Sequence, residues 1–222
     1  MILHILKEDD KPVCFKSGKP VIFFDLDGTC AEFRSMNQEY KDSNGNPKFF
    51  HPRDLYDPGY FRNLAVHKSI CESFRILKAN PDFEVAVLTS VLYDSPYAVN
   101  DKRDWVKEHI GDDVTVIMTP CGKVKRDFIE TTGPVILVDD FSRNLFEWEK
   151  ESPLSFGIKC RNDINGTHGT WKGYSVSTKD NPETIALKII RVTKDIEKLL
   201  GNNNIEFQGF SRNSGDLRDE RS

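Results

Sequence analysis

Val21-Ile22-Phe23-Phe24-Asp25-Leu26-Asp27-Gly28-Thr29 is the stretch of sequence that decides the fold. Its leading apolar run is bounded by turn-forming residues, which predicts a strand over residues 21–26, buried on both faces as in a parallel sheet. Two aspartates emerge where this strand ends. Because ligands in open α/β sheets bind at the carboxyl ends of the strands, the pattern predicts an acidic site at that edge of the sheet.

In the rest of the chain, apolar runs typical of buried strands alternate with segments in which apolar residues recur at helical spacing. This alternation favours a parallel sheet with right-handed crossovers. The further predicted strands are Val85–Leu88, Val114–Met118, Val135–Val138 and Phe156–Cys160. Helices are expected around Val66–Leu77, Asp101–Ile110, Ser142–Lys150 and Asn181–Leu199. Asp101 is the expected cap of the second helix, and residues 1–20 are expected to form a short hairpin.

Length and composition limit the class of protein. The chain has 222 residues and a formal net charge of -4, which fits one α/β domain and argues against a surface that coats nucleic acid. No apolar stretch approaches the roughly 20 residues that span a bilayer, and the first residues lack the apolar core of a signal peptide. We therefore expect a cytoplasmic protein. The five scattered cysteines form no CxxC pair, so they indicate neither a zinc site nor a disulfide framework.

The spacing of Asp25 and Asp27 has a chemical consequence. Two carboxylates this close repel each other unless another charge offsets them, and a divalent cation with oxygen ligands such as Mg²⁺ is the usual partner. Carboxylates and Mg²⁺ at a strand end indicate phosphoryl chemistry with an aspartate as the nucleophile.

Four motifs resemble those of the haloacid dehalogenase (HAD) superfamily. Asp25-Leu26-Asp27-Gly28-Thr29 resembles the first motif and Thr89 the second. Lys123 is the preferred candidate for the third because it follows soon after a strand, with Lys125 as the alternative. Asp139-Asp140 resembles the acidic fourth motif. The resemblance covers roughly residues 20–150 and implies a Rossmann-like core with a parallel sheet flanked by helices.

The resemblance also implies a role for each motif residue. Asp25 is expected to attack phosphorus, and Asp27 to protonate the leaving oxygen and later activate water. Thr89 is expected to donate a hydrogen bond to a phosphoryl oxygen. Lys123 is expected to neutralise the phosphoryl group and the nucleophile.

A metal site is implied by the same motifs. The family places Mg²⁺ between the Asp25 carboxylate, the Asp27 backbone carbonyl and the acidic fourth motif. Asp139 or Asp140 would complete the metal site, and the sequence leaves open which of them binds the ion directly.

The segment between the first two motifs is about twice as long as a strand-helix-strand unit needs. In this superfamily an insertion there forms a cap, so the expected organisation is a core at 1–29 and 80–201, a small cap with the following helix at 30–79, and a disordered tail at 202–222. Leu55–Phe61 and Thr89-Ser90 resemble the 5'(3')-deoxyribonucleotidases within the superfamily.

That narrower resemblance predicts the substrate. Aromatic side chains of the cap could stack on a nucleobase, with Tyr60 and Phe61 as first candidates; Ser90 is a further candidate for substrate binding. The other aromatic candidates are Phe33, Phe49 and Phe50. The expected partner is a small phosphate monoester, a nucleotide, with no membrane and no nucleic-acid polymer; a homodimer stays open.

Two other functions fit parts of the pattern. A phosphatase for a sugar phosphate or another phosphorylated metabolite would keep the mechanism and change only the substrate. A non-catalytic receiver-type domain also carries acids, a threonine and a lysine, but such domains lack an aspartate two residues after the nucleophile. Asp27 therefore favours a phosphatase.

Overall fold

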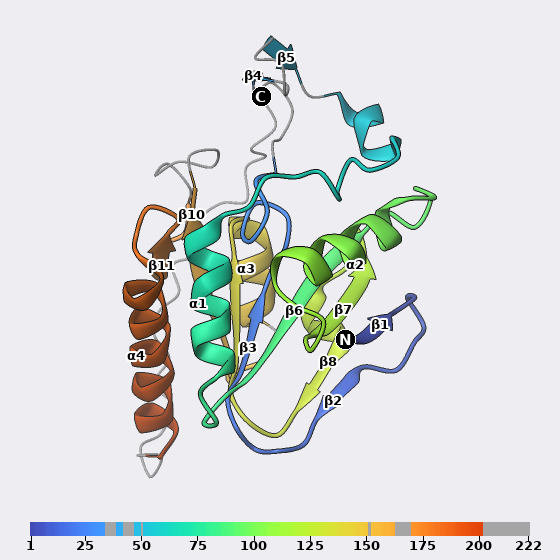
Figure 1. Cartoon of the computed structure of the whole chain (residues 1–222). Coiled ribbons are helices and arrows are strands. Elements are labelled where there is room, and N and C mark those ends of the chain that lie inside the picture. The colour runs from blue at the N-terminus through green and yellow to red at the C-terminus, as the bar shows by residue number, and fades with distance from the viewer. Residues whose placement is uncertain (34–38, 42–46, 50, 151, 163–169, 202–222) are drawn as a thin grey trace.

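The computed structural model describes residues 1–33, 39–41, 47–49, 51–150, 152–162 and 170–201 (Figure 1). Seven strands in this part of the chain form one parallel sheet, as the sequence predicts. In spatial order they are β1 (Ile2–Ile5), β7 (Thr115–Pro120), β6 (Glu84–Val91), β3 (Val21–Phe24), β9 (Val135–Asp139), β10 (Ser155–Arg161) and β11 (Tyr174–Ser177).

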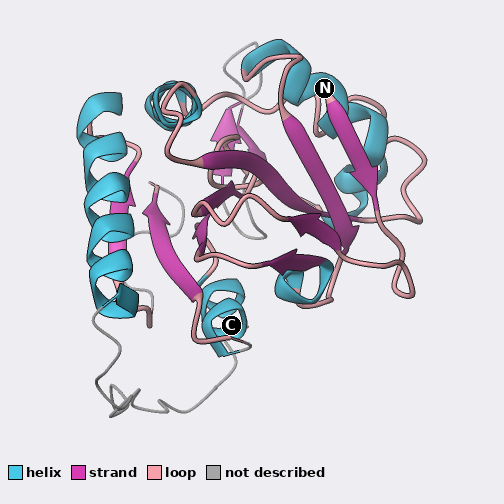
Figure 2. Cartoon of the chain, turned by 90° about the horizontal axis from the view of Figure 1, so that it is seen from below, coloured by secondary structure: helices cyan, strands magenta, loops and turns pink. Residues whose placement is uncertain are grey.

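Helices cover both faces of the sheet (Figures 1 and 2). α1 (Lys68–Lys78), α2 (Ala98–His109) and α4 (Pro182–Gly201) share one hydrophobic cluster with strand side chains. α3 (Ser142–Lys150) packs on the opposite face, beside the short helix η2 (Lys125–Phe128) and the parallel pair β2 (Val13–Phe15) and β8 (Ile129–Thr131). The result is the three-layer α/β architecture expected from the alternation of strands and helices.

The central strand β3 shows why its sequence is apolar throughout. Ile22 and Phe24 belong to the cluster under α1, whereas Val21 and Phe23 belong to the cluster under α3. Successive side chains of a strand point to opposite faces, so a strand covered on both sides must be apolar at every position. All four residues are fully buried.

The structure corrects two local predictions. Residues 1–20 do not form a hairpin: β1 pairs in parallel with β7 at one edge of the sheet, and β2 pairs in parallel with β8. Asp101 does not cap a helix either, because α2 already begins at Ala98 and Asp101 lies one turn inside it. The edge strand β11 was not predicted, because its four residues carry little apolar pattern.

The segment between β3 and α1 extends beyond the carboxyl edge of the sheet in Figure 1. It contains the antiparallel pair β4 (Glu39–Lys41) and β5 (Pro47–Phe49) and the short helix η1 (Pro52–Tyr56). Phe50 and the tail at 202–222 lie outside the described residues. None of the described helices is long and apolar enough to cross a membrane.

Truncating Phe74 tests this packing. Its ring lies edge-on to Phe24, with 5.3 Å between the centroids, and is fully buried. Phe74→Ala is expected to lower the free energy of unfolding by about 3–5 kcal/mol, because the lost apolar burial adds to a cavity. Ile76→Ala, on the exposed side of the same helix, is expected to change it by at most about 0.5 kcal/mol. Urea denaturation measures both, and equal losses would contradict the assignment of faces.

Candidate active site

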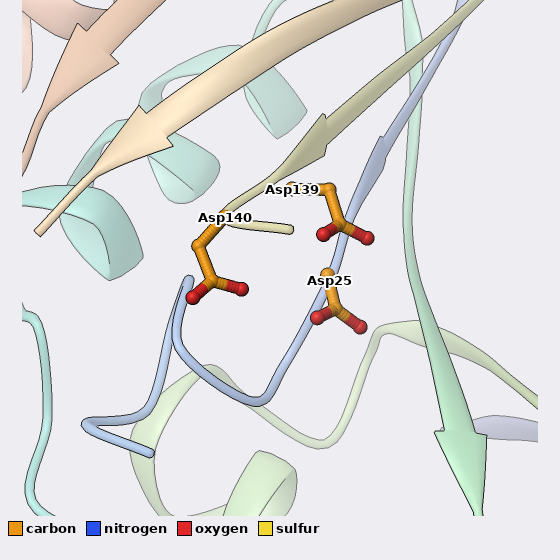
Figure 3. Close-up of side chains that lie close together, drawn as sticks. All are labelled: Asp25, Asp139 and Asp140. Atoms are coloured by element: carbon orange, nitrogen blue, oxygen red, sulfur yellow. The ribbon is translucent and has the colours of Figure 1, made fainter. Parts of the chain in front are cut away.

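Three carboxylates meet at the carboxyl ends of two neighbouring strands. Asp25 follows β3, and Asp139 and Asp140 stand at the end of β9 and directly after it. Because β3 and β9 are parallel and adjacent, these ends coincide, and the Asp25 N–H donates to the Val138 carbonyl at 2.9 Å. One oxygen from each carboxylate lies within 4.8 Å of the other two, and the three side chains lie close together (Figure 3).

Lys125 joins two of these carboxylates. Its Nζ lies 2.7 Å from Asp25 Oδ1 and 2.8 Å from Asp139 Oδ2, and all three side chains are buried. η2 places it there, immediately after the loop that leaves β7. A buried lysine between two buried aspartates stabilises all three charges only while the ion-pair distances are kept.

Burial also shifts the ionisation of this cluster. Loss of solvent raises the pKa of Asp25 to about 7; the charges of Asp139 and Asp27 raise it too, while Lys125 opposes them. Burial lowers the pKa of Lys125, but attraction to Asp139 and Asp25 outweighs this and raises it. Lys125 pairs with Asp25 and Asp139, and carboxylates gathered this closely are stabilised further by an added cation.

The donor set fits a hard divalent cation. The ligand atoms available from Asp25, Asp139 and Asp140 are all carboxylate oxygens, which Mg²⁺ prefers. The two oxygens of Asp139 already accept hydrogen bonds: Oδ1 from the Phe141 N–H at 2.8 Å, and Oδ2 from Lys125 and from Asn144 Nδ2 at 2.9 Å. Three acidic side chains therefore form a cluster that could hold a metal.

The turn at Gly28, directly after the second motif aspartate, lies against Asp140. Gly28 has φ +82°, and a Cβ added there would lie 2.2–2.6 Å from the Asp140 carboxyl atoms, so only glycine fits. Asn162, at the end of β10, donates to the Gly28 carbonyl at 2.6 Å and to Asp140 Oδ2 at 3.3 Å. The turn and the acidic strand end are thereby fixed to each other.

Asp27 is held by a second lysine, which sequence reasoning missed. Lys102 Nζ donates to Asp27 Oδ2, while Asp27 Oδ1 is buried without a hydrogen-bond partner among the described residues. Lys102 also contacts Thr89 Oγ1 at 3.1 Å and the Ser90 carbonyl at 2.6 Å. Lys102 therefore links Thr89 and Ser90, near the end of β6, to Asp27.

A sequence signal for Lys102 existed. The buried residues of α2 recur at helical spacing, and the lysine occupies one of these positions. They are Ala98, Asp101, Lys102, Trp105 and Val106. A charged residue on the buried side of a helix needs a partner in the core, which is the clue that could have identified it.

Lys123, preferred from the sequence over Lys125, is not brought to the carboxylates. It is exposed and pairs with Glu8 at the surface. The two lysines are only two residues apart, but the 3₁₀ turn that begins at Lys125 directs that side chain into the core. Proximity to the strand end alone was therefore a poor guide to which cation reaches the site.

The aromatic candidates form one packed cluster. Phe33, Tyr60 and Phe61 lie with ring centroids 5.0–6.5 Å apart. Phe61 is only 4% exposed, and its ring lies 4.6 Å from Lys102 Nζ. Tyr60 and Phe33 are partly buried against the same core. The side chains of Phe49 and Phe50 lie outside the described part of the structure.

Comparison with known proteins gives a distant similarity to a phage protein. The chain is 28% identical over 98 residues to a protein of Vibrio phage KVP40 named "Putative 5'(3')-deoxyribonucleotidase". The match covers 43% of this chain and 54% of that protein, so it spans about half the length of the relative. No protein-family model matches the chain.

The raised pKa of Asp25 predicts a pH dependence of stability in metal-free protein. Between about pH 4 and about pH 7 the folded state keeps a proton that the unfolded chain has lost, so the contribution of Asp25 falls as the pH rises. Relative to Asp25→Asn, which does not titrate, the wild type should lose up to about 4 kcal/mol of unfolding free energy across this window. Denaturation in EDTA at several pH values measures the difference, and a constant difference would contradict the prediction.

Proposed function

We propose that this protein is a Mg²⁺-dependent phosphomonoesterase of the HAD type that hydrolyses nucleoside monophosphates, with deoxyribonucleotides as the preferred class. The observation that carries the proposal is the contrast between the surroundings of Asp25 and those of Asp27. Asp25 is buried among the acidic cluster and Lys125, whereas Asp27, two residues on, presents an oxygen that has no hydrogen-bond partner among the described residues. These surroundings support Asp25 as the nucleophile and the Asp27 carboxyl group, protonated on Oδ1, as the acid of the first step.

In the first step the Asp25 carboxylate attacks phosphorus. A bond forms between Asp25 and phosphorus, the bond from phosphorus to the ester oxygen breaks, and Asp27 gives its proton to the leaving alcohol. Asp27 Oδ1 suits this donation because no hydrogen-bond partner among the described residues competes for it. The products of the step are a free alcohol and an aspartyl-phosphate.

In the second step water attacks the same phosphorus atom. Asp27, now a carboxylate, accepts the proton of the water, the bond from phosphorus to Asp25 breaks, and inorganic phosphate leaves. The residue that acted as acid in the first step acts as base in the second, and both aspartates return to their starting states.

Asp25, Asp140 and the Asp27 backbone carbonyl would hold Mg²⁺. Asp140 lies against Gly28, directly after Asp27, whereas Asp139 accepts hydrogen bonds from Lys125, Asn144 and the Phe141 N–H; the closeness to the Asp27 carbonyl favours Asp140 as the direct ligand. When bound, the ion supplies positive charge that offsets the charges of the carboxylates and of the phosphoryl group. Lys125, and not Lys123 as expected from the sequence, would neutralise the phosphoryl group and the nucleophile.

The substrate class rests on the phage relative, which is named as a deoxyribonucleotidase, and on the aromatic cluster beside the site. One observation favours the alternative of a smaller phosphorylated metabolite. Phe61, a first candidate for stacking, is buried and its ring already lies against Lys102. Tyr60 is partly buried and remains the stacking candidate for a base.

Phosphate release tests the proposal directly. We expect Mg²⁺-dependent turnover of nucleoside monophosphates that stops in EDTA, assayed across deoxyribo- and ribonucleotides with 5' or 3' phosphates and across small sugar phosphates. Asp25→Asn should be inactive, because an amide does not attack phosphorus, and it controls for contaminating phosphatases. A preference for sugar phosphates would keep the mechanism and replace the substrate, whereas no turnover of any ester would contradict the proposed function.

The two candidate lysines give a second test. Lys125→Met should lower kcat by about 10²- to 10³-fold, because it removes a positioned charge beside the nucleophile. Lys123→Met should stay within about twofold of the wild type, since Lys123 pairs with Glu8 at the surface. Circular dichroism checks that both variants fold, and the opposite ranking of the two activities would refute the assignment of Lys125.

A further inference from the structure

Lys102 lies in an environment that surface lysines do not have. Its side chain is 1% exposed, and its ammonium meets three oxygens: Asp27 Oδ2, Thr89 Oγ1 and the Ser90 carbonyl. An ammonium has three N–H donors, so each has an acceptor. A buried charge that is paired and fully hydrogen-bonded fixes the position of its partners, because any displacement leaves a charge stranded in the core.

The segment after η1 closes the remaining side of Lys102. The Phe61 ring lies 4.6 Å from Nζ, at a distance that suits a cation–π contact. The segment that carries Phe61 is attached to α2 beside Lys102: Trp105 Nε1 donates to the Leu64 carbonyl at 2.8 Å, and Arg62 Nη1 donates to Asp104 Oδ2 at 3.3 Å. These contacts hold the segment that covers Lys102.

From this geometry we propose that Lys102 is the positioning residue for Asp27. Its ammonium fixes Asp27 through Oδ2 and leaves Oδ1 for the oxygen of the substrate, while Phe61 keeps water from the ion pair. The proposal rests on the proposed function, since it assigns how the acid of that reaction is held. Lys102 acts through Asp27 and not on the phosphoryl group.

The proposal predicts a dependence on the leaving group. An alkoxide such as the ribose oxygen needs a proton as it leaves, whereas 4-nitrophenolate is a stable anion and leaves without one. Lys102→Met should therefore lower the single-turnover rate of the first step for a nucleoside monophosphate by about 10- to 100-fold, a part of the 10²- to 10⁴-fold that acid-base catalysis supplies. For 4-nitrophenyl phosphate the initial burst of 4-nitrophenolate should slow by less than about threefold in the same variant, whereas steady-state turnover of both esters should fall, because both need Asp27 as the base of the second step.

A double-mutant comparison separates positioning from a general loss of structure. If Lys102 acts through Asp27, the double variant Lys102→Met/Asp27→Asn should be no slower on nucleotides than Asp27→Asn alone. Independent, multiplicative losses would overturn the proposal, and so would an equal loss of the first-step rate on both classes of ester. Lys107→Met, on the exposed side of α2, is the matched control and should leave both activities unchanged.

Phe61→Leu is the variant to test if Lys102→Met does not fold. It keeps the lysine and an apolar side chain but removes the ring, so we expect a loss of about two- to fivefold in kcat for the nucleotide, no loss in the initial burst rate for 4-nitrophenyl phosphate, and an unchanged KM. A rise in KM with unchanged kcat would show that Phe61 binds the substrate instead, and would overturn its role as a cover.

A crystal structure of Lys102→Met, or of Phe61→Leu if the former does not fold, gives a readout that needs no activity. A displaced Asp27 carboxylate supports the proposal, and a carboxylate in the wild-type position overturns it. If the wild type hydrolyses no ester, the proposed function fails, while this structure still decides whether Lys102 holds Asp27. The two failures are therefore distinguishable.

Discussion

Two buried lysines hold the carboxylates at the edge of the sheet, and the rest of the site depends on these pairings. Lys125 joins the ends of β3 and β9 through Asp25 and Asp139, and Lys102 joins the following turn to β6 through Asp27 and Thr89. Each lysine is satisfied by oxygens from different strands. The charges therefore fix the relative positions of strand ends that hydrophobic packing alone would leave less well defined.

The two pairings separate the aspartates by environment. Asp25 is almost fully buried, and the loss of solvent raises its pKa to about 7 in the absence of a metal. The Asp27 side chain is partly exposed. Lys102 donates to one of its oxygens, and the other has no hydrogen-bond partner among the described residues. Placing two neighbouring carboxyl groups in different surroundings is a general way to give them different chemical roles.

The proposed function follows from the residues of the site and not from the fold. Parallel α/β sheets with helices on both faces carry many unrelated activities. The distant phage relative matches less than half of this chain, so it supports a nucleotidase only together with the geometry of the four aspartates and two lysines. Phe61, in the segment after η1, lies against Lys102, and Lys102 donates to Asp27, so the region expected to meet the substrate contacts the group that holds the proposed acid.

The sequence by itself determined the parallel sheet, most of its strands and helices, and the acidic strand ends, because apolar runs and helical periodicity record which faces are buried. It did not determine which lysine reaches the carboxylates, since Lys123 and Lys125 differ only in the direction that a 3₁₀ turn gives them. It also did not reveal Lys102 or the burial of Phe61, or that residues 1–20 add parallel strands instead of a hairpin. These features depend on contacts between segments far apart in the chain, and only the tertiary structure decides which of several chemically equivalent side chains is enclosed.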